Sequence, residues 1–166
     1  STGSLAAGSD VTVGNTASLN VLGTVNGTVL VDDGGTLKGN GGQFNSAVTI
    51  NGTHAPGSSP GLQTFNNGLT YGSSGILNAE FVGDTLAVRG TDYDGINVTG
   101  GNLSIDLASI FKLTATSVDY TNALWDSARS FTVIDFSGLG TSTGVFTLDT
   151  SLAGSFDSEG GWSLGN

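Results

Sequence analysis

Apolar and polar residues alternate in short triplets along the first hundred residues of the chain. Each triplet precedes a turn of glycine and small polar residues, and four of the five have the order apolar-polar-apolar, whereas the second is apolar throughout; the triplets are residues 11–13, 29–31, 48–50, 69–71 and 96–98. Successive side chains of a strand point to opposite faces, so the outer two members of a triplet face the same side. The pattern therefore predicts a series of three-residue strands, each with one buried face.

The spacing of the triplets indicates how these strands are arranged. Their first residues are 18, 19, 21 and 27 positions apart, whereas the strands of a hairpin meander recur at much shorter intervals. A repeat of about 20 residues with a second apolar position, such as Leu19 and Leu37, is typical of one solenoid coil. We predict an all-β, right-handed parallel β-helix (β-solenoid) with one inner column formed by Val13, Val31, Ile50, Tyr71 and Val98.

A β-sandwich of antiparallel strands is the alternative, because the Asn-Gly turns of the sequence can also close hairpins. Two observations favour the solenoid over the first hundred residues. The repeat has the length of one coil, and successive units run in the same direction, as stacking requires.

The pattern changes after residue 100, where the strands become longer and more aromatic. We therefore divide the chain into solenoid coils over residues 1–100 and a β-rich capping module over residues 101–166 that continues the solenoid. Within this module, residues 121–127 are expected to form a short helical turn. Its Trp125 would cover the open end of the core.

Charge excludes several classes of partner. The chain has 14 acidic and only 4 basic residues, with a formal net charge of −10. Nucleic acids and anionic membrane surfaces bind clusters of Lys and Arg, so neither is an expected partner. No apolar run approaches the ~20 residues of a membrane span, and the absence of Met suggests a mature or excised fragment.

Three segments carry a resemblance to a known family. They are APGSSPG at residues 55–61, LTYG at residues 69–72 and YDGINVTG at residues 93–100. In this order and spacing the chain resembles the autotransporter-associated β-strand repeat proteins, which occur in bacterial autotransporter passengers and in PEP-CTERM-type exported proteins. The resemblance covers roughly residues 11 to 164.

The resemblance implies a right-handed β-helix displayed on or outside a bacterial cell. It implies a stalk, adhesin or passenger scaffold, and it brings no catalytic residues. Similar solenoids occur in phage fibres and virion decoration proteins, so a virion surface is the alternative location. The expected function is a non-catalytic structural or adhesive module, and the alternative is a carbohydrate-binding surface domain.

Few residues are suited to chemistry. His54 is the only histidine, and its position before Ala55 and Pro56 predicts an exposed loop residue. Asp92 and Asp94 are two residues apart and so would share a strand face, which makes them candidate ligands of a calcium ion. The other role for these aspartates is an ion pair with Arg89 that caps the loop before the fifth triplet.

Aromatic residues and chain ends suggest partners. Trp125 and Trp162 are candidate binding residues, because platforms for sugars need exposed aromatic rings. The last coil of a solenoid has unpaired backbone groups on which another chain can stack. The chain itself, joined end to end or laterally, is therefore an expected partner. A surface glycan or protein is the other expected partner. No enzyme activity and no organic cofactor are expected; calcium is the one candidate ion.

Overall fold

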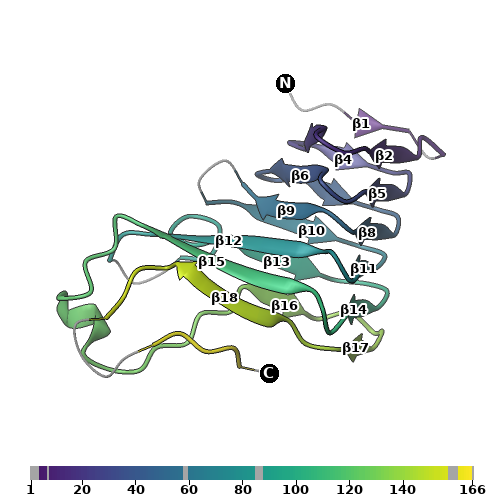
Figure 1. The fold of residues 1–166 in the computed structure, drawn as a ribbon. Helices are drawn as coiled ribbons and strands as arrows, with labels where there is room; N and C mark the ends of the chain where they lie inside the picture. The colour runs from purple at the N-terminus through teal and green to yellow at the C-terminus, as the bar shows by residue number, and fades with distance from the viewer. Residues whose placement is uncertain (1–3, 7, 58–59, 85–87, 157–160, 166) are drawn as a thin grey trace.

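The strands form three parallel sheets that wind around one axis (Figure 1). The computed structural model describes residues 4–6, 8–57, 60–84, 88–156 and 161–165. Each sheet has six described strands. Neighbouring strands within a sheet are always three strands apart in the sequence, as in the order β1-β4-β7-β10-β13-β16. Three consecutive strands therefore make one coil, and six coils are stacked. The predicted parallel β-helix is confirmed, and the antiparallel sandwich is wrong.

Each coil contributes one strand to every sheet. Sheet A contains β1 (Ser4–Leu5), β4 (Thr24–Val25), β7 (Gln43–Phe44), β10 (Leu62–Phe65), β13 (Gly95–Val98) and β16 (Ile134–Phe136). Sheet B contains β2 (Val11–Val13), β5 (Val29–Val31), β8 (Val48–Ile50), β11 (Leu69–Tyr71), β14 (Leu103–Ile105) and β17 (Ser142–Thr143). Sheet C contains β3 (Ser18–Asn20), β6 (Thr36–Gly39), β9 (Thr53–Pro56), β12 (Ile76–Val82), β15 (Ile110–Thr116) and β18 (Thr147–Leu152).

The predicted inner column is correct in four of its five members. The register of sheet B aligns Val13, Val31, Ile50, Tyr71 and Ile105. Val98 was placed in this column wrongly, because it lies in sheet A beside Phe65. The fourth coil ends in the long strand β12, and a long loop follows it, so the next strand of sheet B begins only at Leu103. The fifth triplet of the sequence, residues 96–98, therefore lies in sheet A and not in sheet B.

Each sheet contributes an inner column to one continuous core. In sheet A, the rings of Phe44 and Phe65 stack with centroids 4.7 Å apart and planes inclined by 6°. Like side chains one coil apart can pack in this way because parallel strands keep them in register. The inner column of sheet C consists of Leu19, Leu37, His54, Leu77, Phe111 and Leu148.

An asparagine ladder lines the corner between sheets A and B. The amide of Asn45 donates to Asn26 Oδ1 over 2.7 Å, and the amide of Asn66 donates to Asn45 Oδ1 over 2.7 Å. The hydroxyl of Thr99 donates to Asn66 Oδ1 over 2.7 Å and extends the ladder to the fifth coil. Each hydrogen bond of the ladder links one coil to the next on the outer surface, where the buried apolar side chains make no contact.

The solenoid widens after its third coil. The strands of sheet C have three or four residues in β3, β6 and β9, but seven, seven and six in β12, β15 and β18. Loops beyond the ends of these long strands form a side lobe, which lies to the left in Figure 1. All three sheets run through residue 100 without a break, so the predicted division there stays a prediction.

A short helix lies in the side lobe. This 3-10 helix, η1 (Ala123–Trp125), confirms the helical turn predicted at residues 121–127. The side chain of Asn122 caps it by accepting from the N–H of Leu124 over 2.9 Å. Within the described residues, no helix is long and apolar enough to cross a membrane.

Candidate functional site

His54 is fully buried in the solenoid, so the prediction of an exposed loop residue is wrong. The turn before β6 has four residues, whereas the turn before β9 has only two, and this shortening brings residues 53–56 into a strand. His54 then occupies the inner position between Leu37 and Leu77. The sequence HAPG suggests a turn, and only counting the residues of the preceding turn could have predicted the strand.

A chain of buried hydrogen bonds passes through His54. Gln63 Nε2 donates to the carbonyl of Gly39 over 2.8 Å, so Gln63 Oε1 is free to accept from His54 Nε2 over 2.7 Å. The other ring nitrogen, Nδ1, lies 2.6 Å from the hydroxyl of Tyr71 and must accept its proton, because Nε2 carries the ring's N–H. The network connects three coils and satisfies each of its side chains.

Burial keeps the His54 ring neutral. Removal from water lowers the pKa of His54 to about 4, and the hydrogen bond with Gln63 opposes this effect. Burial raises the pKa of Tyr71 well above its usual value. Both groups are therefore uncharged near pH 7, and their position inside the core assigns them to the stability of the fold.

Asp94 is held by the backbone. Its Oδ1 accepts from the N–H of Gly61 over 2.8 Å and its Oδ2 accepts from the N–H of Glu80 over 2.8 Å, so it joins β12 to the start of β10. Burial raises the pKa of Asp94 to about 7, although both N–H bonds act in the opposite direction. Asp92 instead accepts from the N–H of Val88 within its own loop.

The predicted ion pair between Arg89 and these aspartates is wrong. Arg89 lies across the outer face of sheet A, where Nη2 is 3.5 Å from Asp135 Oδ2 and also donates to Asn97 Oδ1. A Cβ atom on residue 95 would overlap the Arg89 side chain, so residue 95 must be glycine for Arg89 to cross the sheet at this position. Arg89 therefore fastens the loop after β12 to sheet A.

The calcium prediction for Asp92 and Asp94 stays a prediction. Each has a carboxylate oxygen that already accepts a backbone N–H, and Asp94 uses both of its oxygens in this way. In the ranges that the structure describes, no three His, Asp or Glu side chains are grouped so that they could hold a metal ion.

The two tryptophans belong to an aromatic cluster in the side lobe. Both are half-buried, Trp125 Nε1 donates to Asp84 Oδ1 over 2.9 Å, and Trp162 Nε1 lies 3.3 Å from the hydroxyl of Tyr120. The ring centroids of the two tryptophans are 5.5 Å apart. Their predicted role in binding is untested, but their packing and paired N–H groups account for them within the fold. The other rings of the cluster are Phe81, Tyr93, Tyr120, Phe131 and Phe156.

Asp84 organises the side lobe and was not identified from the sequence. Its two oxygens accept from the N–H of Asp119 over 3.0 and 2.9 Å, in addition to the indole N–H of Trp125. Both partners are distant from Asp84 in the sequence and follow the whole of the fifth coil, so no local motif indicates the contact.

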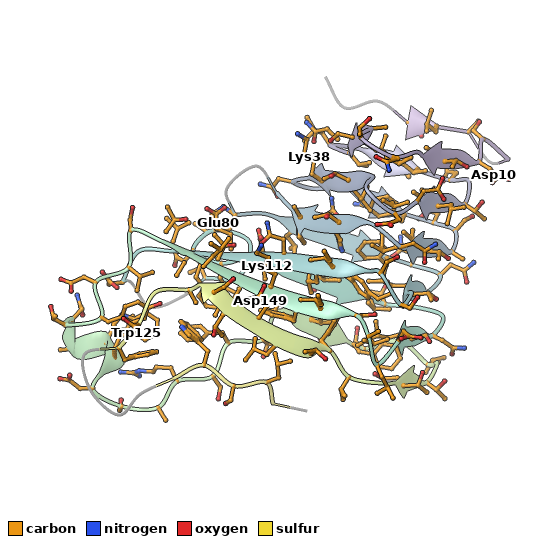
Figure 2. All side chains as sticks on the ribbon, viewed as in Figure 1. Asp10, Lys38, Glu80, Lys112, Trp125 and Asp149 are labelled. Carbon is orange, nitrogen blue, oxygen red and sulfur yellow. The ribbon has the colours of Figure 1, made fainter. Side chains whose placement is uncertain are left out.

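A hollow lies on the outer face of sheet C, next to the buried carboxylate of Asp94. It has a volume of about 250 Å³ and lies where β12 and β15 extend past the end of β9. Figure 2 places Glu80 on this extended part of β12, on the side toward the lobe. The hollow is lined by Ala55, Pro56, Gly57, Asn78, Glu80, Asp94 and Thr114.

Comparisons with known proteins gave no match: no family model, curated protein or solved structure is significantly similar to this chain.

Proposed function

We propose that this chain is a non-catalytic structural or adhesive module that acts outside a bacterial cell, as a surface passenger, stalk or fibre component. The observation that carries the proposal is the parallel stacking of all three sheets through six coils, in which the described pairs keep one register except for a single shift between β15 and β18. A stack in which each coil packs on the next forms a stiff unit that can hold a binding surface away from its attachment point.

The links between coils support a mechanical role. Inner columns such as Phe44 with Phe65 join coils through the core, and the asparagine ladder joins them outside. The buried network at His54 adds hydrogen bonds across three coils. Because these interactions act in parallel between the same coils, pulling one coil from the next must break several of them at once.

Surface chemistry supports an extracellular location. The outer column of sheet B consists mainly of small hydroxyl residues, in the order Thr12, Leu30, Thr49, Thr70, Ser104 and Thr143. Such a face is polar without being charged. Together with the resemblance to exported repeat proteins, it favours a surface passenger over a cytosolic enzyme.

Adhesion under flow tests this function. Beads coated with the chain should be retained on bacterial cells or on surfaces coated with bacterial polysaccharide, whereas beads coated with the Val31→Asp variant should wash off. Val31 is fully buried in the inner column, and an unpaired charge there should unfold the solenoid without otherwise changing the composition. Equal retention of both beads, or release of reducing ends from any of the polysaccharides, would contradict the proposal.

A further inference from the structure

The hollow on sheet C combines an apolar floor with polar walls. Ala55, Pro56 and Gly57 at the end of β9 provide carbon atoms on one side. Asn78 and Glu80, which lie two positions apart on β12, face outward on the other side, with Thr114 beside them on β15. Because the floor is the end of one coil and the walls belong to the next two, the widening of the solenoid creates this hollow.

The hydrogen bonds among the polar side chains of the hollow determine which of their atoms remain available to bind a ligand. The hydroxyl of Thr114 donates to Asn78 Oδ1 over 2.9 Å, which orients the amide and leaves Asn78 Nδ2 as a donor. The hydroxyl of Thr116 donates to Glu80 Oε1 over 3.1 Å, which leaves Glu80 Oε2 as an acceptor. In the described part of the chain, Glu80 forms no salt bridge. A fixed donor and a charged acceptor therefore lie next to each other.

This set of groups distinguishes between ligand classes. A metal ion is disfavoured, because Asn78 Oδ1 and both oxygens of Asp94 already accept hydrogen bonds. A purely apolar ligand would leave the Glu80 carboxylate without water or a partner. A sugar ring can meet both the carboxylate and the apolar floor, since its hydroxyls can donate to Glu80 and accept from Asn78 while its C–H face packs on Ala55, which faces outward from β9.

The size of the hollow sets the size of the ligand. Its volume of about 250 Å³ is below the ~300 to 1,000 Å³ of sites for drug-sized molecules. We propose that the hollow formed by Ala55, Asn78 and Glu80 binds one saccharide ring, either free or as a unit of a surface glycan. This inference rests on the adhesive function proposed above and assigns its contact site.

Two variants test the site by different means. Glu80→Gln removes the charged acceptor and should weaken binding about ten-fold or more, as expected for a hydrogen bond to a charged group. Ala55→Phe places a ring in the hollow and should abolish binding. The matched control is Asp149→Asn, which removes a charge from the same sheet face two strands away from Asn78. Melting temperatures identify any variant that has lost its fold.

Binding is measured with a printed array of bacterial and host glycans, followed by NMR titration with the free monosaccharides of any glycan that binds. We expect at least one glycan to bind, with loss in Glu80→Gln and Ala55→Phe but not in Asp149→Asn. Absence of binding to every glycan, or binding that is unchanged in both folded hollow variants, would overturn the inference. Retention of beads under flow that is insensitive to both variants would overturn the site while leaving the adhesive function intact.

Discussion

Tyr71 Oη and His54 Nδ1 lie 2.6 Å apart inside the solenoid, and the hydroxyl donates to the ring nitrogen. Tyr71 comes from the fourth coil and His54 from the third, so the bond links two coils through the core. Because both side chains are buried, neither can exchange its partner for water. The pair therefore provides a probe of coil-to-coil contact inside the stack.

Tyr71→Phe should lower the free energy of unfolding by about 1 to 3 kcal/mol, because His54 Nδ1 would remain buried without a donor. Urea denaturation followed by circular dichroism measures the change. The control is Thr70→Val, an outward-facing change on the same strand, with an expected effect within about 0.5 kcal/mol. A Tyr71→Phe variant as stable as the parent chain would contradict the buried bond.

The His54 ring should titrate far below the ordinary histidine pKa. With a pKa of about 4 in the folded state and 6.5 in the unfolded state, the unfolded chain binds the proton first as the pH falls. The contribution of His54 to stability is thus complete above pH 6.5 and is lost toward pH 4, by about 1.4 kcal/mol per pH unit.

NMR measures this titration directly, because the chain has a single histidine. Because the pKa of Asp94 is raised, its contribution to the free energy of unfolding increases as the pH falls from 7 to 3.8, opposite to that of His54. Unfolding curves alone would therefore report the sum of the two contributions. The His54 ring resonances should remain constant from pH 8 to about pH 5. A transition centred near pH 6.5 in the folded protein would show that the ring contacts water.

Asn45→Ala should remove two rungs of the asparagine ladder, since Asn45 both donates to Asn26 and accepts from Asn66. The free energy of unfolding should fall by about 1 to 2 kcal/mol. Asn67→Ala is the control, because Asn67 is an exposed neighbour outside the ladder. Equal effects of the two substitutions would mean that the ladder does not stabilise the stack.

Asp84→Ala should loosen the side lobe without unfolding the coils. The loss of the acceptor for Trp125 Nε1 and for the N–H of Asp119 should expose the indole rings, shift tryptophan emission to longer wavelength and speed proteolysis within residues 117–133. Far-ultraviolet circular dichroism should be unchanged. Cleavage and emission like those of the parent chain would show that aromatic packing alone holds the lobe.

The triplet pattern predicted the architecture because stacked coils repeat the same alternation of buried and exposed residues. The prediction holds where the turns have similar lengths, as it does for Val13, Val31, Ile50 and Tyr71. It failed at Val98, because a long loop follows β12 and the fifth triplet belongs to sheet A. The separate prediction of His54 as a loop residue failed because the turn before β9 has only two residues. The triplets show where the strands of sheet B lie but not where the following turn ends, so they do not place the next strand.

The candidate sites were less predictable than the fold. The hollow depends on β12 and β15 being longer than β9, and the lobe depends on Asp84 meeting Asp119 and Trp125 from a distant part of the sequence. Neither relationship has a local motif. Asp94 was identified from its sequence position, but its carboxylate binds backbone N–H groups that the sequence could not place beside it.

Disulfide formation between engineered cysteines tests coil stacking most directly, because the native chain has no cysteine. The register places Thr70 beside Ser104, and adjacent strands are about 4.8 Å apart, within the range that a disulfide can span. Thr70→Cys with Ser104→Cys should cross-link rapidly on mild oxidation, as measured by mobility on a non-reducing gel. Thr70→Cys with Asn97→Cys, the pairing that a column through Val98 would require, should not. Cross-linking of the second pair in place of the first would contradict the stacked coils described above.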